Sequence, residues 1–264
     1  MIAISDLILT NRYTKWFQTV LPVIVFLSLW EIVSRLEIVN PRLFPPPSLV
    51  WNALLEWAEK GELWRDIKAS YWRMLIGYFI GGSLGIVAGI LTGRSRLINL
   101  SLSPIIQVLR PMPPVAIIPL VIVWLGIGDI AKIFSISFAV FFPVWINTHL
   151  GASSVASIYL WSAKILCPSK IRIIFNVLIP AVLPSIVAGL RTSIAIAFIM
   201  VYVAEIAGAS SGIGYQISVS HLAYRIDKMV AALFVLAFAG ALADFLFARL
   251  IQAAFPWMQA DRNH

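Results

Sequence analysis

Residues 74–93 read MLIGYFIGGSLGIVAGILTG and contain no charged side chain. An α-helix of about 20 apolar residues is long enough to cross the hydrocarbon core of a bilayer, which is about 30 Å thick. A helix also satisfies its backbone hydrogen bonds internally, which lipid cannot do for it. This stretch therefore predicts a transmembrane helix and indicates that the chain is an all-α membrane protein.

Glycines recur along this stretch at every fourth residue. They are Gly77, Gly81, Gly85, Gly89 and Gly93. Residues four apart lie on one face of a helix, so these glycines form a ridge without side chains. Such a ridge lets a second backbone approach closely in lipid. We predict that it packs against another helix of the same subunit, and the alternative is a role in ligand binding.

The remainder of the chain predicts several more spans. Of its 264 residues, 60% are hydrophobic and 12% are charged, whereas roughly 25% are charged in a soluble domain. The mean hydropathy is +0.91. Further apolar stretches are Trp16–Ile32, Pro104–Leu125, Ile133–Thr148, Pro184–Gly208 and Met229–Leu250. We therefore expect a polytopic membrane protein with about six transmembrane helices, forming one transmembrane domain over residues 1–264.

Residues 33–70 differ from these stretches in composition. They carry five basic and five acidic residues, together with Trp51, Trp57 and Trp64. Tryptophan rings are most at home at the level of the lipid headgroups. We expect short helices at the membrane surface here, in an extracytoplasmic interfacial segment.

The distribution of basic residues predicts the orientation. Arg94 and Arg96 follow the second span, and residues 151–180 carry Lys164, Lys170 and Arg172 without an acidic residue. Cytoplasmic loops have an excess of lysine and arginine. The pattern predicts that both termini and the loop 151–180 lie in the cytoplasm.

The third apolar stretch contains a break. Residues 109–114 read LRPMPP, and each proline removes an amide donor and disfavours helical geometry in the residue before it. Broken backbone at membrane depth is tolerated where protein or a water-filled cavity covers it. Arg110 at this break could attract an anion. Alternatively, it extends to the cytoplasmic interface or caps a helix end.

Two charged residues lie within the fifth stretch. Arg191 and Glu205 are fourteen residues apart, which is roughly 21 Å along a helix and too far for a direct ion pair. Charges within a membrane usually face the interior of the bundle or a cavity. Arg110, Arg191 and Glu205 are therefore the candidate substrate-pathway residues. Purely structural pairing of Arg191 and Glu205 with other groups stays open.

Several classes of function are excluded by what the sequence lacks. The net charge is +8, but the basic residues are scattered, so we expect no nucleic-acid binding. There is no G-x-x-x-x-G-K-[ST] phosphate loop, and the three histidines are isolated. We therefore predict no catalytic residue, metal site or bound cofactor. Cys167 is the only cysteine, so no intrachain disulfide can form, and residues 1–18 show no cleavage site of a removable signal peptide.

The loop predicted to be cytoplasmic carries the first family motif. Residues 159–167 read YLWSAKILC and, nine residues later, residues 177–180 read VLIP. This pattern resembles the EAA loop of ABC importer permeases, which is Glu-Ala-Ala, three residues, Gly, nine residues and Ile-x-Leu-Pro. Ala163 and Pro180 match it, whereas Trp161 stands in place of Glu, Ser162 in place of the first Ala and Cys167 in place of Gly.

Further motifs continue the resemblance in order along residues 40–250. They include the LRPMPP break, IPL at 118–120, WLGIG at 124–128, GLR at 189–191, AE at 204–205 and SGIGY at 211–215. Together they are similar to the nitrate/sulfonate/taurine/bicarbonate permeases. These are the inner-membrane components of binding-protein-dependent ABC importers.

The resemblance implies the type I ABC importer permease fold and import of a small oxyanion across a bacterial inner membrane. The implied partners are a second permease subunit, two cytoplasmic ATPases that bind ATP and Mg, an extracytoplasmic solute-binding protein and membrane lipid. A homodimer is favoured over a heterodimer. The coupling residues carried over are Trp161, Ser162, Ala163, Lys164, Leu166, Cys167 and Pro180.

Other interpretations stay open from the residues alone. An ABC permease for a different small solute would share these motifs. A secondary transporter usually shows paired repeats, and residues 1–132 and 133–264 have no visible self-similarity. A membrane scaffold without transport would not require arginines beside broken or glycine-rich backbone.

Overall fold

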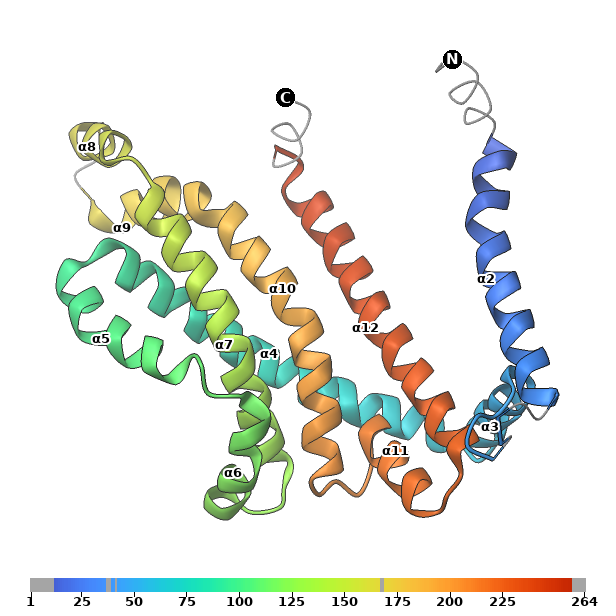
Figure 1. Cartoon of the computed structure of the whole chain (residues 1–264). Helices are drawn as coiled ribbons and strands as arrows, with labels where there is room; N and C mark the ends of the chain where they lie inside the picture. The colour runs from blue at the N-terminus through green and yellow to red at the C-terminus, as the bar shows by residue number, and fades with distance from the viewer. Residues whose placement is uncertain (1–11, 37–38, 41, 167–168, 258–264) are drawn as a thin grey trace. The chain divides into compact units, whose positions relative to one another are not determined.

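Helices make up the regular structure wherever the chain is described. The computed structural model describes residues 12–36, 39–40, 42–166 and 169–257, and no strand occurs in these ranges. The all-α prediction is therefore confirmed. In chain order (Figure 1) the elements are α2 (Arg12–Arg35), α3 (Pro47–Glu59), α4 (Glu62–Arg94), α5 (Arg96–Leu109), the 3₁₀ turn η1 (Pro114–Ile117), α6 (Ile118–Leu125), α7 (Asp129–Ser154), α8 (Ser157–Leu166), α9 (Lys170–Ile173), the π-helical turn η2 (Ile174–Leu178), α10 (Ile179–Ile206), α11 (Ile213–Leu222) and α12 (Ile226–Ala254).

Four of these helical stretches are long and apolar enough to cross a membrane. Among the described residues they are Glu62–Arg94, Asp129–Ser154, Ile171–Ile206 and Ile226–Ala254. A fifth span results if α5 and the segment Pro114–Leu125, which are bent by 86° at their junction, count as one. The first predicted span falls within α2, which is not among the four, so the count of about six is not confirmed.

The third predicted span is not a single straight helix. α5 ends at Leu109, and the chain resumes as η1 only at Pro114. The prolines at 111, 113 and 114 account for the break, because none of them can donate a backbone hydrogen bond. Pro104, by contrast, lies inside α5. The predicted interruption is present, and it is sharp enough to change the direction of the chain.

The chain divides into two compact units. The first comprises Met1–Glu62 with Ile217–Ala232, and the second comprises Leu63–Gln216 with Leu233–His264. In the first unit, Val50, Ala53 and Ala231 form a small apolar core. Beside it, Glu56 accepts hydrogen bonds from Lys228, Lys60 and Arg225. The bonds from Lys228 and Lys60 lower the pKa of Glu56 to about 2.

The segment predicted to be interfacial is only partly separate from the second span. α3 is the expected short helix, and Trp57 on it is buried whereas Trp51 is exposed. Residues 62–70, however, continue directly into α4, which has 33 residues and is about 50 Å long at 1.5 Å per residue. The polar residues of this stretch suggested surface structure, but Asp66 and Ser70 are buried by partners described below.

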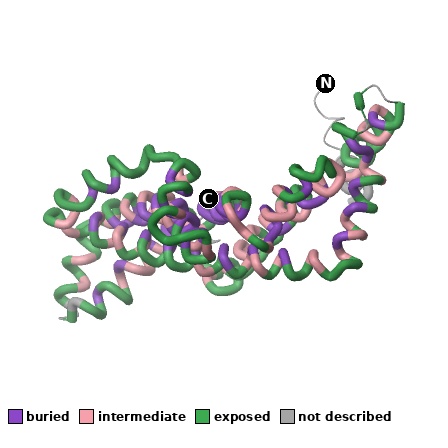
Figure 2. Tube along the Cα trace, turned by 90° about the horizontal axis from the view of Figure 1, so that it is seen from below, coloured by how far each residue is buried: buried purple, intermediate pink, exposed green. Residues whose placement is uncertain are grey.

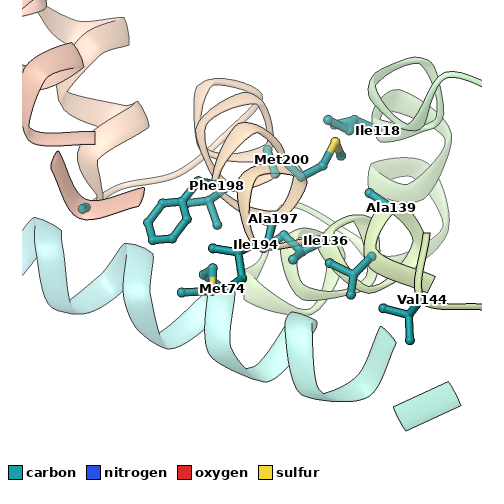
Figure 3. Packing of buried hydrophobic residues seen from close by; sticks show 13 residues of the cluster. Met74, Ile118, Ile136, Ala139, Val144, Ile194, Ala197, Phe198 and Met200 are labelled. Atoms are coloured by element: carbon teal, nitrogen blue, oxygen red, sulfur yellow. The ribbon is translucent and has the colours of Figure 1, made fainter. Parts of the chain in front are cut away.

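α7 is the central helix of the second unit. Of its 18-residue apolar window 56% is buried, against 28% for the span that contains α10 and 17% for α12. Its side chains interlock with those of α4 and α10 (Figure 3), and the shared core includes Met74, Ile136, Val144, Ala197 and Met200. Most other helical surface remains exposed (Figure 2) and is apolar, as expected for surface that meets lipid.

The glycine ridge of α4 lies against α7. A Cβ atom added at Gly77 would lie 2.7 Å from the Ile136 side chain, and one at Gly85 would lie 2.9 Å from the Phe141 carbonyl oxygen. Gly81, Gly89 and Gly93 have equally close neighbours on the same helix. The two helices thus approach to a distance that only glycine permits, and van der Waals contact replaces the hydrophobic drive that lipid does not supply.

Candidate functional site

The first candidate site is an ion pair between the two least buried spans. Arg191 on α10 donates from Nε to Asp244 Oδ1 and from Nη2 to Oδ2 on α12, and both distances are 2.9 Å. The side chains are 49% and 41% exposed. This is the parallel, two-bond geometry in which a guanidinium matches a carboxylate. Arg191 therefore has a partner, but the pair stays accessible from outside the chain.

The ion pair lines a groove of about 770 Å³. One wall is α10, with Pro184, Ala188, Arg191 and Thr192, and the other is α12, with Asp244 and Gln252. Ligand sites usually have 300–1,000 Å³ and a few well-placed polar groups on apolar walls. Since exposed charges within spans face water or protein rather than lipid, this groove can hold a small polar solute.

Glu205 occupies a different environment, because its carboxylate is fully buried. Arg73 Nη1 donates to Glu205 Oε1 at 2.7 Å, and the Arg73 side chain is itself only 6% exposed. The same guanidinium donates to the Ser211 carbonyl at 2.7 Å and to Asp129 at 2.8 Å. Ser70 also donates to the Glu205 carboxylate at 2.9 Å. Glu205 is thus the centre of a fixed polar network.

The N-terminus of α11 completes this network. The backbone amides of Gly212, Ile213 and Gly214 donate to Asp66, Ser70 and Glu205 respectively, at 2.8–2.9 Å. These are amides that no helix can pair internally, and the positive end of the helix favours the two carboxylates. Gly212 has φ +127, and a Cβ there would overlap the Glu205 carboxylate. The network therefore joins α4, α10 and the start of α11 through buried charge.

The remaining pathway candidate is separate from both sites. Arg110 is the C-cap residue of α5, and its backbone amide donates to the Ile106 carbonyl oxygen at 2.9 Å. Its side chain is exposed. Arg110 is not among the residues that line the groove beside Arg191. The assignment of Arg110, Arg191 and Glu205 to a substrate path stays a prediction.

The predicted coupling residues lie on and after α8. Trp161 is 61% exposed, Ser162 and Lys164 are exposed, and Ala163 is partly buried. Leu166 is the last residue of α8, and Cys167 lies outside the described residues. Pro180 is the second residue of α10 and directly follows the π-helical turn η2. Trp161 and Lys164 line a groove of about 450 Å³ together with Arg94.

The buried carboxylates of the second unit lie close to one another around Arg73 and the start of α11. Within the described part of the chain, no group of three or more His, Cys, Asp or Glu residues is placed to hold a metal ion. The carboxylates that do cluster, Glu205 and Asp66, accept hydrogen bonds from Arg73 and from backbone amides. These two carboxylates thus serve an ion pair and a helix N-terminus.

Comparison with known proteins identifies the family. Residues 81–256 match the family described as binding-protein-dependent transport system inner membrane component. The chain belongs to this family. It is therefore a permease subunit, which is a multi-pass inner-membrane component of a transport system that depends on a binding protein.

Named relatives match the permease over most of its length. It is 34% identical to SsuC of Bacillus subtilis, a protein named for aliphatic sulfonates transport, over 92% of this chain and 87% of that one. It is 31% identical to the taurine transport system permease protein TauC of Escherichia coli, over 88% and 86%. It is 33% identical to the bicarbonate transport system permease protein CmpB of Synechocystis sp., over 83% and 81%.

A solved structure shares the fold. A chain of the MetNI methionine ABC transporter in an inward facing conformation superposes with a TM-score of 0.61, covering 72% of this chain and 95% of that chain. The identity is 19%, so this likeness concerns the fold alone. It confirms the expected type I ABC importer permease fold.

Two of the most important partners were not predicted from the sequence. Arg73 directly precedes the uncharged stretch 74–93, and Asp244 lies near the end of the last apolar stretch. Either could have been suspected, because a charge inside a membrane protein usually has a partner of opposite sign. Nothing local, however, matches Arg73 to Glu205 or Asp244 to Arg191.

Proposed function

We propose that this permease forms the translocation path of an ATP-driven importer for a small oxyanion, with an alkanesulfonate or taurine as the first candidate and nitrate or bicarbonate as further members of the class. The observation that carries the proposal is the half-exposed Arg191 guanidinium on a groove between two membrane spans. The substrates named for SsuC, TauC and CmpB support it, since all of them have an oxyanion group.

The chemistry of the groove suits such a substrate. A guanidinium presents two parallel N–H donors, which match two oxygens of a carboxylate, and a sulfonate or bicarbonate offers oxygens at similar spacing. The apolar wall, with Pro184, Ala188 and Phe247, can accept the alkyl part of a sulfonate. Weak, solvent-accessible binding also suits a transport site, because the substrate has to leave it again.

The energy for transport comes from partner subunits in this proposal. ATP and Mg bind to two cytoplasmic ATPases, and the permease chain itself catalyses no reaction. A solute-binding protein delivers the substrate from outside, and a second copy of the permease completes the path. Both termini and the segment 151–180 lie in the cytoplasm. ATP binding and the loaded binding protein each bias a two-state opening of the cavity.

Replacement of Arg191 tests the proposed path. We expect Arg191→Ala to abolish uptake of radiolabelled taurine or alkanesulfonate by vesicles that contain the permease, its ATPase and its binding protein. The reason is that the groove loses its anion-binding group. Assembly with the ATPase should be unchanged, because Arg191 is half exposed.

A double variant separates the path from a structural role of the ion pair. Arg191→Ala alone leaves Asp244 without its partner, whereas Arg191→Ala with Asp244→Asn leaves no unpaired charge. If the pair were only structural, the double variant would regain uptake. The proposal requires the double variant to stay inactive, and uptake at the parent rate in either variant would refute it.

The coupling role is tested at Trp161. If this exposed indole docks into the ATPase, Trp161→Ala should weaken docking by about 2 kcal/mol or more, as for other aromatic anchors. Transport and binding-protein-stimulated ATP hydrolysis should then fall together while the membrane fold survives. The same experiment reports the orientation, because the ATPases are cytoplasmic.

The neighbouring exposed residue Ile165 provides a control on the same helix. It is 85% exposed and lies outside the groove that Trp161 lines, so Ile165→Ala should retain more of the docking energy. Co-purification of the ATPase and its hydrolysis rate are measured for both variants. Parent values of both quantities in Trp161→Ala would rule out the docking role.

A further inference from the structure

The chain contains two kinds of arginine–carboxylate pair. Arg73 and Glu205 are 6% and 0% exposed and are held by further hydrogen bonds from Ser70 and Gly214. Arg191 and Asp244 are 49% and 41% exposed and meet on an open groove. A buried pair cannot exchange a partner without uncovering a charge. An exposed pair has little more favourable free energy than its two separately hydrated groups, so either group can readily exchange its partner.

Asp244 uses one complete edge of the Arg191 guanidinium. The bonds from Nε and Nη2 have equal lengths of 2.9 Å and end on different carboxylate oxygens. This is the arrangement that a substrate with two adjacent oxygens would adopt on the same edge. Asp244 therefore occupies the position of a substrate oxyanion at its strongest anchor.

The surroundings leave space for the carboxylate to move aside. On α12 the residues one turn before and after Asp244 are Gly240 and Ala248. On α10 the residues three before and four after Arg191 are Ala188 and Ala195. Ala188, Ala195 and Ala248 all line the groove. These small residues leave room beside the ion pair, whereas Val187 and Phe247 provide the bulk of the groove walls.

We propose that Asp244 is a built-in counter-anion that the transported oxyanion must displace from Arg191. This inference rests on the proposed function, since it assumes that the substrate binds the Nε and Nη2 donors of Arg191. In the empty state Asp244 neutralises the groove. A halide ion offers a single acceptor and cannot reproduce two parallel bonds, so it competes poorly with Asp244. An oxyanion with two suitably spaced oxygens competes on equal terms, and Asp244 thereby sets both affinity and selectivity.

The test measures binding without the binding protein, whose own affinity would mask that of the permease. Methanesulfonate is titrated calorimetrically into the detergent-purified permease–ATPase complex, in dilute Tris fluoride, which contains no chloride, carboxylate or sulfonate. We expect Asp244→Asn to bind methanesulfonate about five- to tenfold more tightly, because the competing charge is gone. Chloride at 100 mM should then inhibit binding to the variant and leave the parent chain nearly unaffected.

Asp227→Asn is the matched control. Asp227 also accepts hydrogen bonds on both carboxylate oxygens from an exposed arginine, Arg225, the shortest at 2.9 Å and 2.7 Å, but it lies outside the groove. Its replacement should change neither methanesulfonate affinity nor chloride sensitivity. Asp244→Ala is the second variant at the site and should behave as Asp244→Asn does.

The outcomes distinguish this inference from the proposed function. If Arg191→Ala abolishes binding but both Asp244 variants bind as the parent chain or more weakly, the counter-anion role is wrong and the anion path stands. If Arg191→Ala binds normally, the path and the counter-anion role are both wrong. Failure of both Asp244 variants to assemble with the ATPase would make Asp244 a structural residue and would also overturn the inference.

Discussion

Replacing Glu205 by alanine is expected to destabilise the permease by about 3–5 kcal/mol, which is the usual cost of removing one partner from a buried ion pair. The substitution leaves Arg73, 6% exposed, without its buried carboxylate. It also removes the acceptor of the Gly214 amide and of the Ser70 hydroxyl. A membrane bundle with a normal stability of 5–15 kcal/mol would lose much of it.

A graded series makes this prediction specific. Glu205→Gln keeps the shape and some hydrogen bonds but not the charge, so it should fall between the parent chain and Glu205→Ala. Glu56→Ala is the control, because Glu56 also bonds to several cations but its side chain is 38% exposed, and pairs that water can reach contribute less. Thermal unfolding in detergent, monitored by size-exclusion chromatography, ranks the stabilities of these variants. Equal midpoints for Glu205→Ala and Glu56→Ala would contradict the assignment of Glu205 to a buried network.

The second large effect is expected at Gly81. Its Cβ would lie 2.9 Å from the Ser137 Cα atom and closer still to the Ser137 carbonyl oxygen. These are backbone atoms of α7, which can yield only if the whole helix moves. Overpacking of a closed interface typically costs 1–3 kcal/mol and occasionally more, and we expect Gly81→Ala to reach about 3 kcal/mol because two helices must separate.

Gly240 provides the matched control for this substitution. It is also a glycine within a membrane helix of the second unit, but its Cβ would meet only the Phe198 ring, at 3.6 Å, which is ordinary contact. Alanine is favoured over glycine in helices by about 1 kcal/mol, so Gly240→Ala should be neutral or stabilising. The thermal unfolding midpoints of the Gly81→Ala and Gly240→Ala variants test this difference in stability. A stable, fully assembled Gly81→Ala permease would show that α4 and α7 do not pack through this ridge.

Local sequence predicted the features of this fold that depend on local chemistry. The uncharged stretch 74–93 indicated a helix, and the prolines at 111, 113 and 114 indicated a break, because both effects act within a few residues. The glycine spacing also indicated a close helix contact, although nothing in it specifies α7 as the partner. The family motifs supplied the overall architecture.

The features that local sequence could not predict depend on tertiary pairing. Asp66, Ser70 and Arg73 resemble surface residues in composition, so the uncharged span 74–93 gives no sign that α4 begins as early as Glu62. Their burial is stable only because Glu205 and the amides at the start of α11 form hydrogen bonds with them. Likewise, the sequence shows Arg191 as a charge within an apolar span, but its pairing with Asp244 follows from how α10 and α12 approach each other.

The buried network also depends on the order in which its residues are synthesised. Glu205 follows Arg73 by 132 residues, which a ribosome adds in roughly 7–26 s at about 5–20 residues per second. During that interval the carboxylate available to Arg73 within this network is that of Asp129, which follows it by 56 residues. Arg73 directly precedes the uncharged stretch, where its long side chain can reach the lipid headgroups until Glu205 has been synthesised. Arrival of α10 then closes the network and commits the nascent helices to their final neighbours.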